Sequence, residues 1–263
     1  MANITIHGNT YDVSAINYVK NGVTNPVSTL VLNGNTVFPA QSGGLPEKKS
    51  FSEMTWADIQ TVCKAGKASE YWAIGDTKVI SSDGARSVCI IGFDHDTPAD
   101  MAAYGRSKAG ITVESVYCYS AGIKLNSTSS TVGGWKECSA RQNFFTQLPD
   151  ALGLEQYIVP VKKLCSTGGS SGATIEEVVD TAFVLSEVEI FGDTSYSLVG
   201  EGEQYDWYKN NDAKKTTEGG VDSVVRWTRS PYGSRYYACV TAAGLSFNYT
   251  PNGLRYFSFA FCV

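Results

Sequence analysis

The fold of this chain is set by RWTRSPYGSRYYACV at residues 226–240 and by FAFCV at residues 259–263. Trp227 precedes a polar loop on a predicted strand, and Tyr237, Phe259 and Phe261 alternate as inward-facing strand residues do, so we predict all four as core. The residues between them are rich in Tyr, Arg, Asn, Ser and Gly. Binding loops use this composition because rigid rings give contact area at a low entropic cost, and small polar residues adapt.

We therefore predict a ligand-binding surface in this part of the chain. Its aromatic and polar residues are too many and too mixed to be buried together, and an exposed cluster of this kind is a candidate binding hot spot. The predicted ligand-binding residues are Tyr232, Ser234, Arg235, Tyr236, Phe247, Asn248, Tyr249, Asn252, Leu254, Arg255 and Tyr256. An ordinary solvated face is the alternative interpretation.

Composition narrows the class of protein. The 263 residues are 43% hydrophobic, which is ample for the core of one large domain with a small appendage. Abundant Gly and Tyr and short apolar runs favour a β-rich α+β fold. A net charge of −5 argues against a nucleic-acid partner. We also expect no membrane insertion and no secretory signal, since no apolar run approaches the length of a membrane span.

The first forty residues form a unit of their own. Short strands are predicted at 4–6, 15–20 and 28–32, next to turn signals at Gly8-Asn9, Asn21-Gly22 and Asn33-Gly34. A Gly-, Pro- and Ser-rich stretch follows at residues 39–46, as is typical between domains. We predict a small β-hairpin unit at residues 1–45 and a larger domain at residues 46–263.

In the larger domain, local patterns predict both helices and strands. A helix is expected between Ser52 and Gly66, with Thr55 as a second capping option, and another is expected at residues 138–148, stopped by Pro149. The predicted strands lie at residues 76–80, 87–93, 109–113, 158–161 and 182–191.

Three patterns resemble catalytic or metal sites, and we interpret each as structural. The GGSSG sequence at 168–172 matches a nucleophile motif, but neither His7 nor His95 follows it, so a flexible loop is favoured. Asp94, His95 and Asp96, with Asp100 nearby, could hold Ca²⁺, but turn and helix-cap acids explain them better.

Glu187 and Glu189 share one face of the predicted strand, which favours a half-solvated strand over a catalytic carboxylate pair. We predict no catalytic residue, no metal site and no cofactor.

The seven cysteines contain no C-x-x-C pair, and their number is odd. Buried free thiols fit this pattern better than disulfides or a zinc site. Cys239 and Cys262 lie on predicted C-terminal strands, so whether they pair is left open.

A family resemblance rests on motifs that occur in order along the chain. They are FSEMTW at 51–56, YWAIGD at 71–76, IGFDHD at 91–96, GGW at 133–135, LSEVEIFG at 185–192, GEGEQY at 200–205 and WTRSP at 227–231. Over about residues 50–263 the chain resembles a domain family of gut-bacterial prophages and phage tail proteins. That family resembles the C-type-lectin-like fold, which formylglycine-generating enzymes share.

The C-terminal stretch of the chain, at about residues 227–263, also resembles the variable region of proteins that are diversified by diversity-generating retroelements. In such proteins a reverse transcriptase changes codon positions templated by adenine and spares the scaffold. The predicted ligand-binding residues are all reachable from an Asn codon in this way.

The resemblance implies a non-enzymatic receptor-binding protein. It would be made in a bacterial cytoplasm, reside in the virion tail and bind a host cell-surface protein or glycan. The unit at residues 1–45 would attach it to other tail proteins or form oligomers, and both a monomer and a trimer are open.

Two alternatives come from other classes of protein. One is an oxidase of the formylglycine-generating type. The chemistry of these enzymes resembles a two-thiolate copper site, formed by closely spaced cysteines near the C-terminus. Cys262 has no cysteine a few residues before it, which makes this alternative unfavourable. The other is a purely structural tail decoration.

Overall fold

The computed structural model describes residues 2–6, 9–13, 17–20, 23–26, 30–32, 35–38, 44–80, 86–119, 122–169, 172–209, 217–218, 221–222 and 224–263. Two compact units are present, Met1–Pro46 and Glu47–Val263, which divide within the Gly- and Pro-rich stretch. Every helix in the described part of the chain is too short or too polar to cross a membrane.

The residues of the first unit that the structure describes form three antiparallel hairpins. They pair β1 (Ala2–Ile6) with β2 (Asn9–Val13), β3 (Asn17–Lys20) with β4 (Val23–Pro26), and β5 (Leu30–Leu32) with β6 (Asn35–Phe38). The predicted strands overlap the first strand of each hairpin, whereas the second strands were not predicted. Lys20 pairs with Val23 and Leu32 with Asn35, which leaves two-residue connections as Asn-Gly turns require. Those connecting residues lie outside the described residues.

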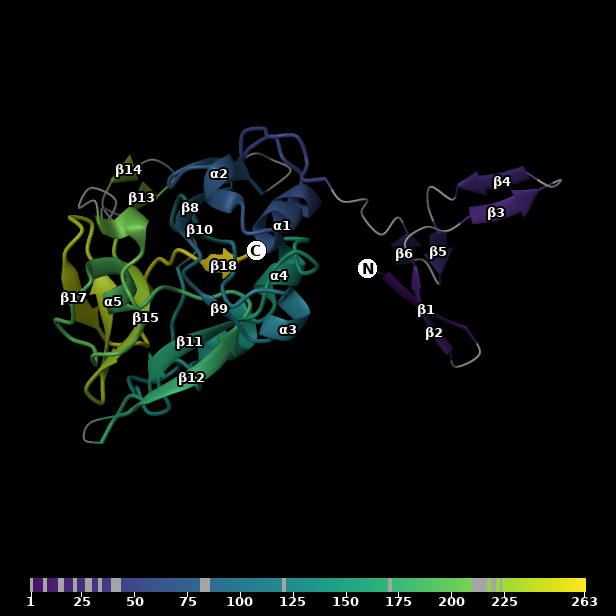
Figure 1. The fold of residues 1–263 in the computed structure, drawn as a ribbon. Coiled ribbons are helices and arrows are strands. Elements are labelled where there is room, and N and C mark those ends of the chain that lie inside the picture. The colour runs from purple at the N-terminus through teal and green to yellow at the C-terminus, as the bar shows by residue number, and fades with distance from the viewer. Residues whose placement is uncertain are drawn as a thin grey trace. The chain divides into compact units, whose positions relative to one another are not determined.

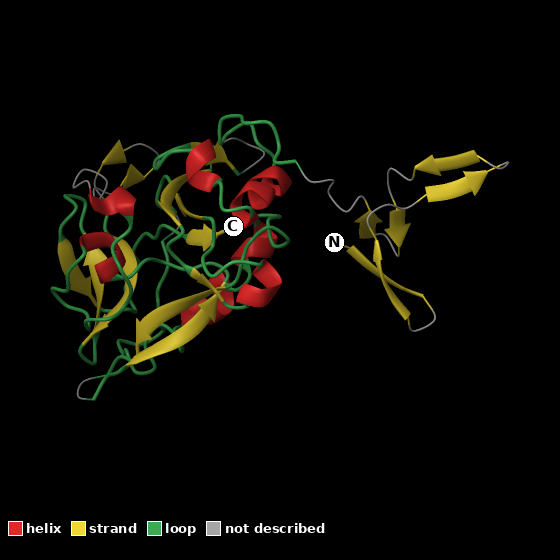
Figure 2. Ribbon diagram, viewed as in Figure 1, coloured by secondary structure: helices red, strands yellow, loops and turns green. Residues whose placement is uncertain are grey.

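The second unit combines short helices with mostly antiparallel sheets, so the α+β prediction is confirmed (Figure 2). The helices are α1 (Trp56–Lys64), α2 (Ala68–Tyr71), α3 (Met101–Tyr104), α4 (Leu148–Ala151) and α5 (Glu187–Phe191), with a π-helix η1 (Arg141–Phe145) and a 3-10 helix η2 (Asp206–Lys209). The strands are β7 (Thr77–Val79), β8 (Ser87–Phe93), β9 (Thr97–Pro98), β10 (Ile111–Ser115), β11 (Val161–Ser166), β12 (Ile175–Asp180), β13 (Thr217–Glu218), β14 (Val221–Asp222), β15 (Arg226–Tyr232), β16 (Tyr236–Val240), β17 (Ser246–Tyr249) and β18 (Ala260–Cys262).

In the described part of this unit, three sheets have three or more strands. Their strand orders are β18-β10-β8-β7, β12-β11-β9 and β15-β16-β17, and β13 pairs with β14 (Figure 1). The C-terminal strand β18 connects distant segments, because Cys262 pairs with Thr112 and bridges to Val159, and Ala260 bridges to Phe183. The predicted core residues of the C-terminal part of the chain are confirmed as buried: Trp227, Tyr237, Phe259 and Phe261.

Most predictions for the first half of the second unit are confirmed. The first helix is α1, and the second capping option is the one used, since Thr55 Oγ1 accepts a hydrogen bond from Asp58 N at 3.1 Å. The strands expected at 76–80, 87–93 and 109–113 correspond to β7, β8 and β10. The strand expected at 158–161 starts later, as β11.

The predicted strand at residues 182–191 is wrong. Residues 187–191 form helix α5, which Ser186 begins with a capping box: Ser186 Oγ accepts from Glu189 N, and Glu189 Oε2 accepts from Ser186 N. Gly192 ends the helix in the left-handed conformation, with φ +73°. The S-x-x-E spacing was the sequence signal for this helix start.

The second predicted helix is partly wrong. The chain forms η1 and then α4, and Pro149 lies in the first turn of α4 instead of stopping a helix.

The GGSSG stretch joins β11 to β12, so a strand and not a helix follows it, which excludes a nucleophile elbow. Ser170 and Ser171 lie outside the described residues.

Candidate functional site

The sheet β15-β16-β17 changes abruptly from buried to exposed at the β15–β16 hairpin. Residues 226–231 are buried, whereas the side chain of Tyr232 is 42% exposed; on the returning strand Tyr236 is 39% exposed and Tyr237 is fully buried. Tyr232 and Tyr236 pair directly across the hairpin. The hairpin end is therefore presented to solvent by strands that belong to the core.

None of the predicted ligand-binding residues is buried. Tyr232, Ser234, Arg235, Tyr236, Phe247, Asn252 and Leu254 are exposed, and Asn248, Tyr249, Arg255 and Tyr256 are half-buried. Their exposure makes them available for contact, and their role in binding stays a prediction.

Ring contacts divide these residues into two groups. At the hairpin, the ring centroids of Tyr232 and Tyr236 lie 6.4 Å apart. On β17, Phe247 and Tyr249 lie 5.4 Å apart, and the Arg255 guanidinium lies 4.0 Å from the centre of the Tyr249 ring. The surface thus contains two aromatic clusters.

The two clusters do not share one flat face. Phe247 lies directly opposite Cys239, and Tyr249 lies opposite Tyr237, so both rings point to the same side of the sheet as these buried residues. They remain accessible because β17 is the edge strand. Which side each ring takes depends on strand register, which the sequence pattern did not reveal.

Loop contacts hold both clusters in place. Buried Thr131 donates from its hydroxyl to the carbonyl of Gly233 at 2.6 Å, and its N–H donates to the carbonyl of Ser234 at 3.2 Å. Ile123 and Arg255 exchange two backbone hydrogen bonds. The surface is consequently supported by loops distant in sequence.

Behind this surface lies a buried ion-pair network that the sequence analysis missed. Arg229 of β15 is fully buried and donates two hydrogen bonds to the Glu189 carboxylate of α5. Lys163 of β11 lies 2.6 Å from Glu189 Oε1 and 2.6 Å from Asp96 Oδ1. Burial raises the pKa of Glu189, but the charges of Arg229 and Lys163 outweigh it and lower the pKa to about 2.

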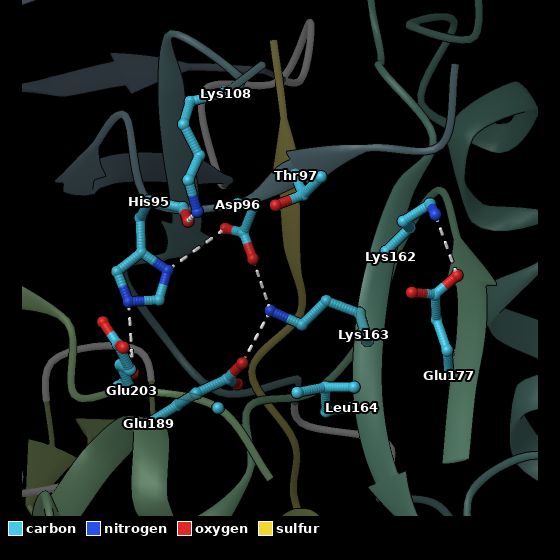
Figure 3. Close-up of a pocket in the computed structure, with 11 residues that line it drawn as sticks. His95, Asp96, Thr97, Lys108, Lys162, Lys163, Leu164, Glu177, Glu189 and Glu203 are labelled. Carbon is cyan, nitrogen blue, oxygen red and sulfur yellow. Dashed lines mark hydrogen bonds and ion pairs between the residues drawn. The ribbon is translucent and has the colours of Figure 1, made fainter. Parts of the chain in front are cut away.

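The same network forms the floor of a pocket of about 360 Å³ (Figure 3). The residues that line the pocket are His95, Asp96, Thr97, Lys108, Lys162, Lys163, Leu164, Glu177, Glu189, Gly202 and Glu203.

The polar groups of this floor are largely satisfied within the protein. Lys163 Nζ contacts Asp96, Glu189 and the Tyr205 hydroxyl. These three contacts use all three N–H donors of the Lys163 ammonium group. Asp96 Oδ2 accepts from Tyr205 at 2.7 Å and from Thr112 at 2.5 Å. These groups are therefore occupied by one another, and we take the exposed aromatic surface as the candidate site.

These contacts correct two interpretations of the acidic residues. Asp100 caps α3 by accepting from Ala103 N, as predicted, and Asp94 follows β8. Asp96, in contrast, is a buried partner of Lys163 and not a turn residue in solvent. Glu187 and Glu189 are fully buried on a helix, so the half-solvated strand was wrong. In the described part of the chain, no group of three or more His, Cys, Asp or Glu residues could hold a metal ion.

All seven cysteines are buried and free. Cys239 lies on β16 between Trp227 and Phe247, whereas Cys262 lies on β18, with its Sγ 3.3 Å from the Thr112 hydroxyl. Burial raises the pKa of both thiols. The open question of their pairing is thereby answered for this structure: they are on different sheets and unpaired.

The comparisons with known proteins give a family but no activity. Residues 114–255, more than half of the chain, match the family model described as "Domain of unknown function (DUF6273)". No curated protein and no solved structure matches the chain. The matched range runs from β10 through β17 and contains every predicted ligand-binding residue except Tyr256. The chain therefore belongs to the DUF6273 family.

Proposed function

We propose that this protein is a non-enzymatic ligand-binding protein of a phage tail, which recognises host cell-surface proteins or glycans through the β15–β17 surface. The observation that carries the proposal is the sharp boundary of burial at the β15–β16 hairpin, where exposed Tyr232 and Tyr236 directly adjoin buried Pro231 and Tyr237. The α+β architecture with mostly antiparallel sheets is compatible with a C-type-lectin-like fold.

This boundary suits a surface that changes while its scaffold is retained. Substitution of exposed loop residues usually has little effect on folding, whereas truncation of buried Trp or Tyr creates cavities. A receptor-binding protein needs this separation, because host receptors vary and the virion must still assemble. A near-copy of the codons for residues 227–263 beside a reverse-transcriptase gene would support diversification in this chain.

The hairpin unit, residues 1–46, is proposed to attach the protein to other tail proteins or to join protomers. Its hairpins offer short edge strands for pairing with another chain. The size of the purified protein in solution would distinguish a monomer from a trimer.

We expect Tyr236→Ala to reduce binding while the unfolding midpoint stays nearly unchanged. Tyr249→Ala should reduce binding and also lower the midpoint, because Tyr249 is half-buried against the core. The fluorescently labelled protein would be applied to an array of bacterial surface glycans and proteins and to fixed mixed gut bacteria. Loss of the exposed Tyr236 ring should change the free energy of unfolding by roughly 0.5 kcal/mol or less.

Two control variants sharpen this test. Tyr117→Ala removes a ring whose exposure, 42%, is close to the 39% of Tyr236, but Tyr117 follows β10 of another sheet, so binding should stay intact. Trp227→Ala should destabilise the protein by about 3–5 kcal/mol, because the indole is buried and donates to the carbonyl of Ile123. Unchanged binding in both Tyr236→Ala and Tyr249→Ala would contradict the proposal.

The positions and the burial of the C-terminal cysteine thiols argue against the oxidase alternative. Copper prefers thiolate ligands, whereas Cys239 and Cys262 lie on different sheets and burial keeps both protonated. Uptake of one copper ion per chain would favour the oxidase. Assembly into particles without binding to any array member would favour a structural decoration.

A further inference from the structure

A segment outside the C-terminal stretch contributes an aromatic ring to the hairpin cluster. Tyr196, in the loop after α5, packs edge-on against Tyr232, with ring centroids 5.2 Å apart and an interplanar angle of 69°. Tyr232 in turn adjoins Tyr236, so three tyrosines form one continuous group. Tyr196 is half-buried, and Leu198 and Val199, which follow it, are exposed.

We infer that Tyr196 is a further recognition residue and that buried Glu187 is the residue that positions it. The inference rests on the proposed function of the β15–β17 surface. It adds a contact from the α5 loop, outside the region of residues 227–263 that is proposed to vary.

Glu187 connects the loop to the sheet through its carboxylate. Its Oε2 accepts hydrogen bonds from Tyr196 N at 3.0 Å, from Ser197 N at 2.7 Å and from the Ser197 hydroxyl at 2.8 Å. Its Oε1 accepts from the hydroxyl of Ser246 on β17. The Glu187 N–H donates to the hydroxyl of Ser230 on β15 at 2.8 Å. The fully buried Glu187 thus joins the loop to β17 through its side chain, and its backbone N–H adds a bond to β15.

The chemistry of this site favours a carboxylate. Four donors converge on two oxygens, and an ionised carboxylate offers only acceptors. A glutamine that directs its NH₂ group at the loop would break the loop contacts. With the NH₂ group toward β17, the Ser246 hydroxyl can accept its hydrogen bond, but the neutral amide oxygen that faces the loop is a weaker acceptor than a carboxylate oxygen. In both orientations the backbone bond that sets Tyr196 against Tyr232 is weakened or lost.

The test compares single and double variants in binding to fixed mixed gut bacteria, measured by flow cytometry with labelled full-length protein. Tyr196→Ala should weaken binding by about thirtyfold, as for a hot-spot residue, whereas Tyr196→Phe should retain binding because the ring makes the contact. Glu187→Gln should weaken binding as well. In the Tyr196→Ala background, however, Glu187→Gln should have little additional effect, since it acts through Tyr196.

A readout without ligand accompanies the binding assay. Glu187→Gln should speed hydrogen exchange at the amides of Tyr196 and Ser197, while the amides of β8 stay protected. If Glu187→Gln does not fold, Ser197→Ala replaces it, which removes one bond to Oε2 and should weaken binding about fivefold.

The outcomes separate the inference from the proposed function. If Tyr236→Ala loses binding and Tyr196→Ala keeps it, the inference is overturned and the proposed function stands. Additive effects of the two substitutions, or unchanged exchange at Tyr196, overturn the positioning role of Glu187. If the wild-type protein binds neither the cells nor the array, the proposed function fails, and the inference fails with it.

Discussion

At the scale of single residues, the buried glutamates Glu189 and Glu201 near Arg229 have pKa values shifted in opposite directions. Glu189 is surrounded by Arg229 and Lys163, and their charges hold its carboxylate ionised. Glu201 is equally buried and accepts a hydrogen bond from Ser166 N at 2.7 Å. Burial raises the pKa of Glu201 to about 7, and the charge of Arg229 only partly offsets this.

This difference predicts a pH effect on stability. The pKa of Glu201 rises from its ordinary 4.5 to about 7 on folding, so the folded state binds more protons between these values. The contribution of Glu201 to stability is therefore complete below about pH 4.5 and is lost as the pH rises through about 7, by up to about 3 kcal/mol. Glu201→Gln should remove this dependence. In urea unfolding, the free energy of unfolding of the variant should therefore rise relative to that of the wild type as the pH increases from about 4.5 to 7. Parallel stability curves for the two proteins would contradict the assignment.

At the scale of elements, α5 shows how tertiary contacts create a helix that is too short to form alone. Its five residues begin with the capping box of Ser186 and end at Gly192. The side chains of Glu187 and Glu189 connect it to β17 and β15 of one sheet. The helix therefore exists because its ends and buried charges are satisfied by other segments.

Substitution of the terminal glycine tests this view against a matched position. Gly105 ends α3 and Gly192 ends α5, both in the left-handed conformation. An added Cβ meets nothing within 4 Å at Gly105, but lies 2.7 Å from Gln204 Oε1 at Gly192. Gly105→Ala should cost about 1–2 kcal/mol from backbone strain alone, and Gly192→Ala should cost more.

The extra cost at Gly192 should arise because Gln204 cannot move freely. Its Nε2 donates to the carbonyls of Ile190 and Tyr208, and displacement of the side chain would break these bonds. Chemical denaturation of both variants measures the difference. Equal losses of stability would show that the contact with Gln204 is unimportant.

At the scale of the whole molecule, the scaffold and the candidate surface belong to the second unit. Its sheets share a core that includes Trp135, Phe145 and Phe257, whose rings pack against one another. The ion-pair network joins β11, α5 and β15 across this unit. Folding of this unit is therefore expected to depend on its own residues.

We expect residues 47–263 to fold without the first 46 residues. The fragment should unfold cooperatively at the same midpoint as the second unit in the full-length protein, measured by near-UV circular dichroism. It should also retain binding to gut bacteria if the β15–β17 surface is responsible. A fragment that lacks a cooperative transition would show that the hairpin unit is needed for folding.

The sequence by itself determined the features that depend on neighbours along the chain. Turn signals and alternation located strands such as β8 and the first strand of each N-terminal hairpin, and they assigned Trp227 and Tyr237 to the core. The change of burial at the β15–β16 hairpin was predictable only in part: Trp227 and Tyr237 were expected in the core and Tyr232 and Tyr236 on the surface, but the burial of polar Thr228, Arg229 and Ser230 was not expected.

Only the tertiary structure decided which partners the charged residues meet. Arg229 and Glu189 are 40 residues apart, and Lys163 and Asp96 are 67 apart, so no local pattern connects them. For the same reason, Glu187 and Glu189 looked like solvated strand residues, although α5 buries both. The side of the sheet taken by Phe247 depends on register with β16, and the backbone N–H of Tyr196 meets Glu187, nine residues before it, only in the folded unit. Local sequence sets periodicity and turns, whereas pairing between distant segments is fixed only when the whole unit packs.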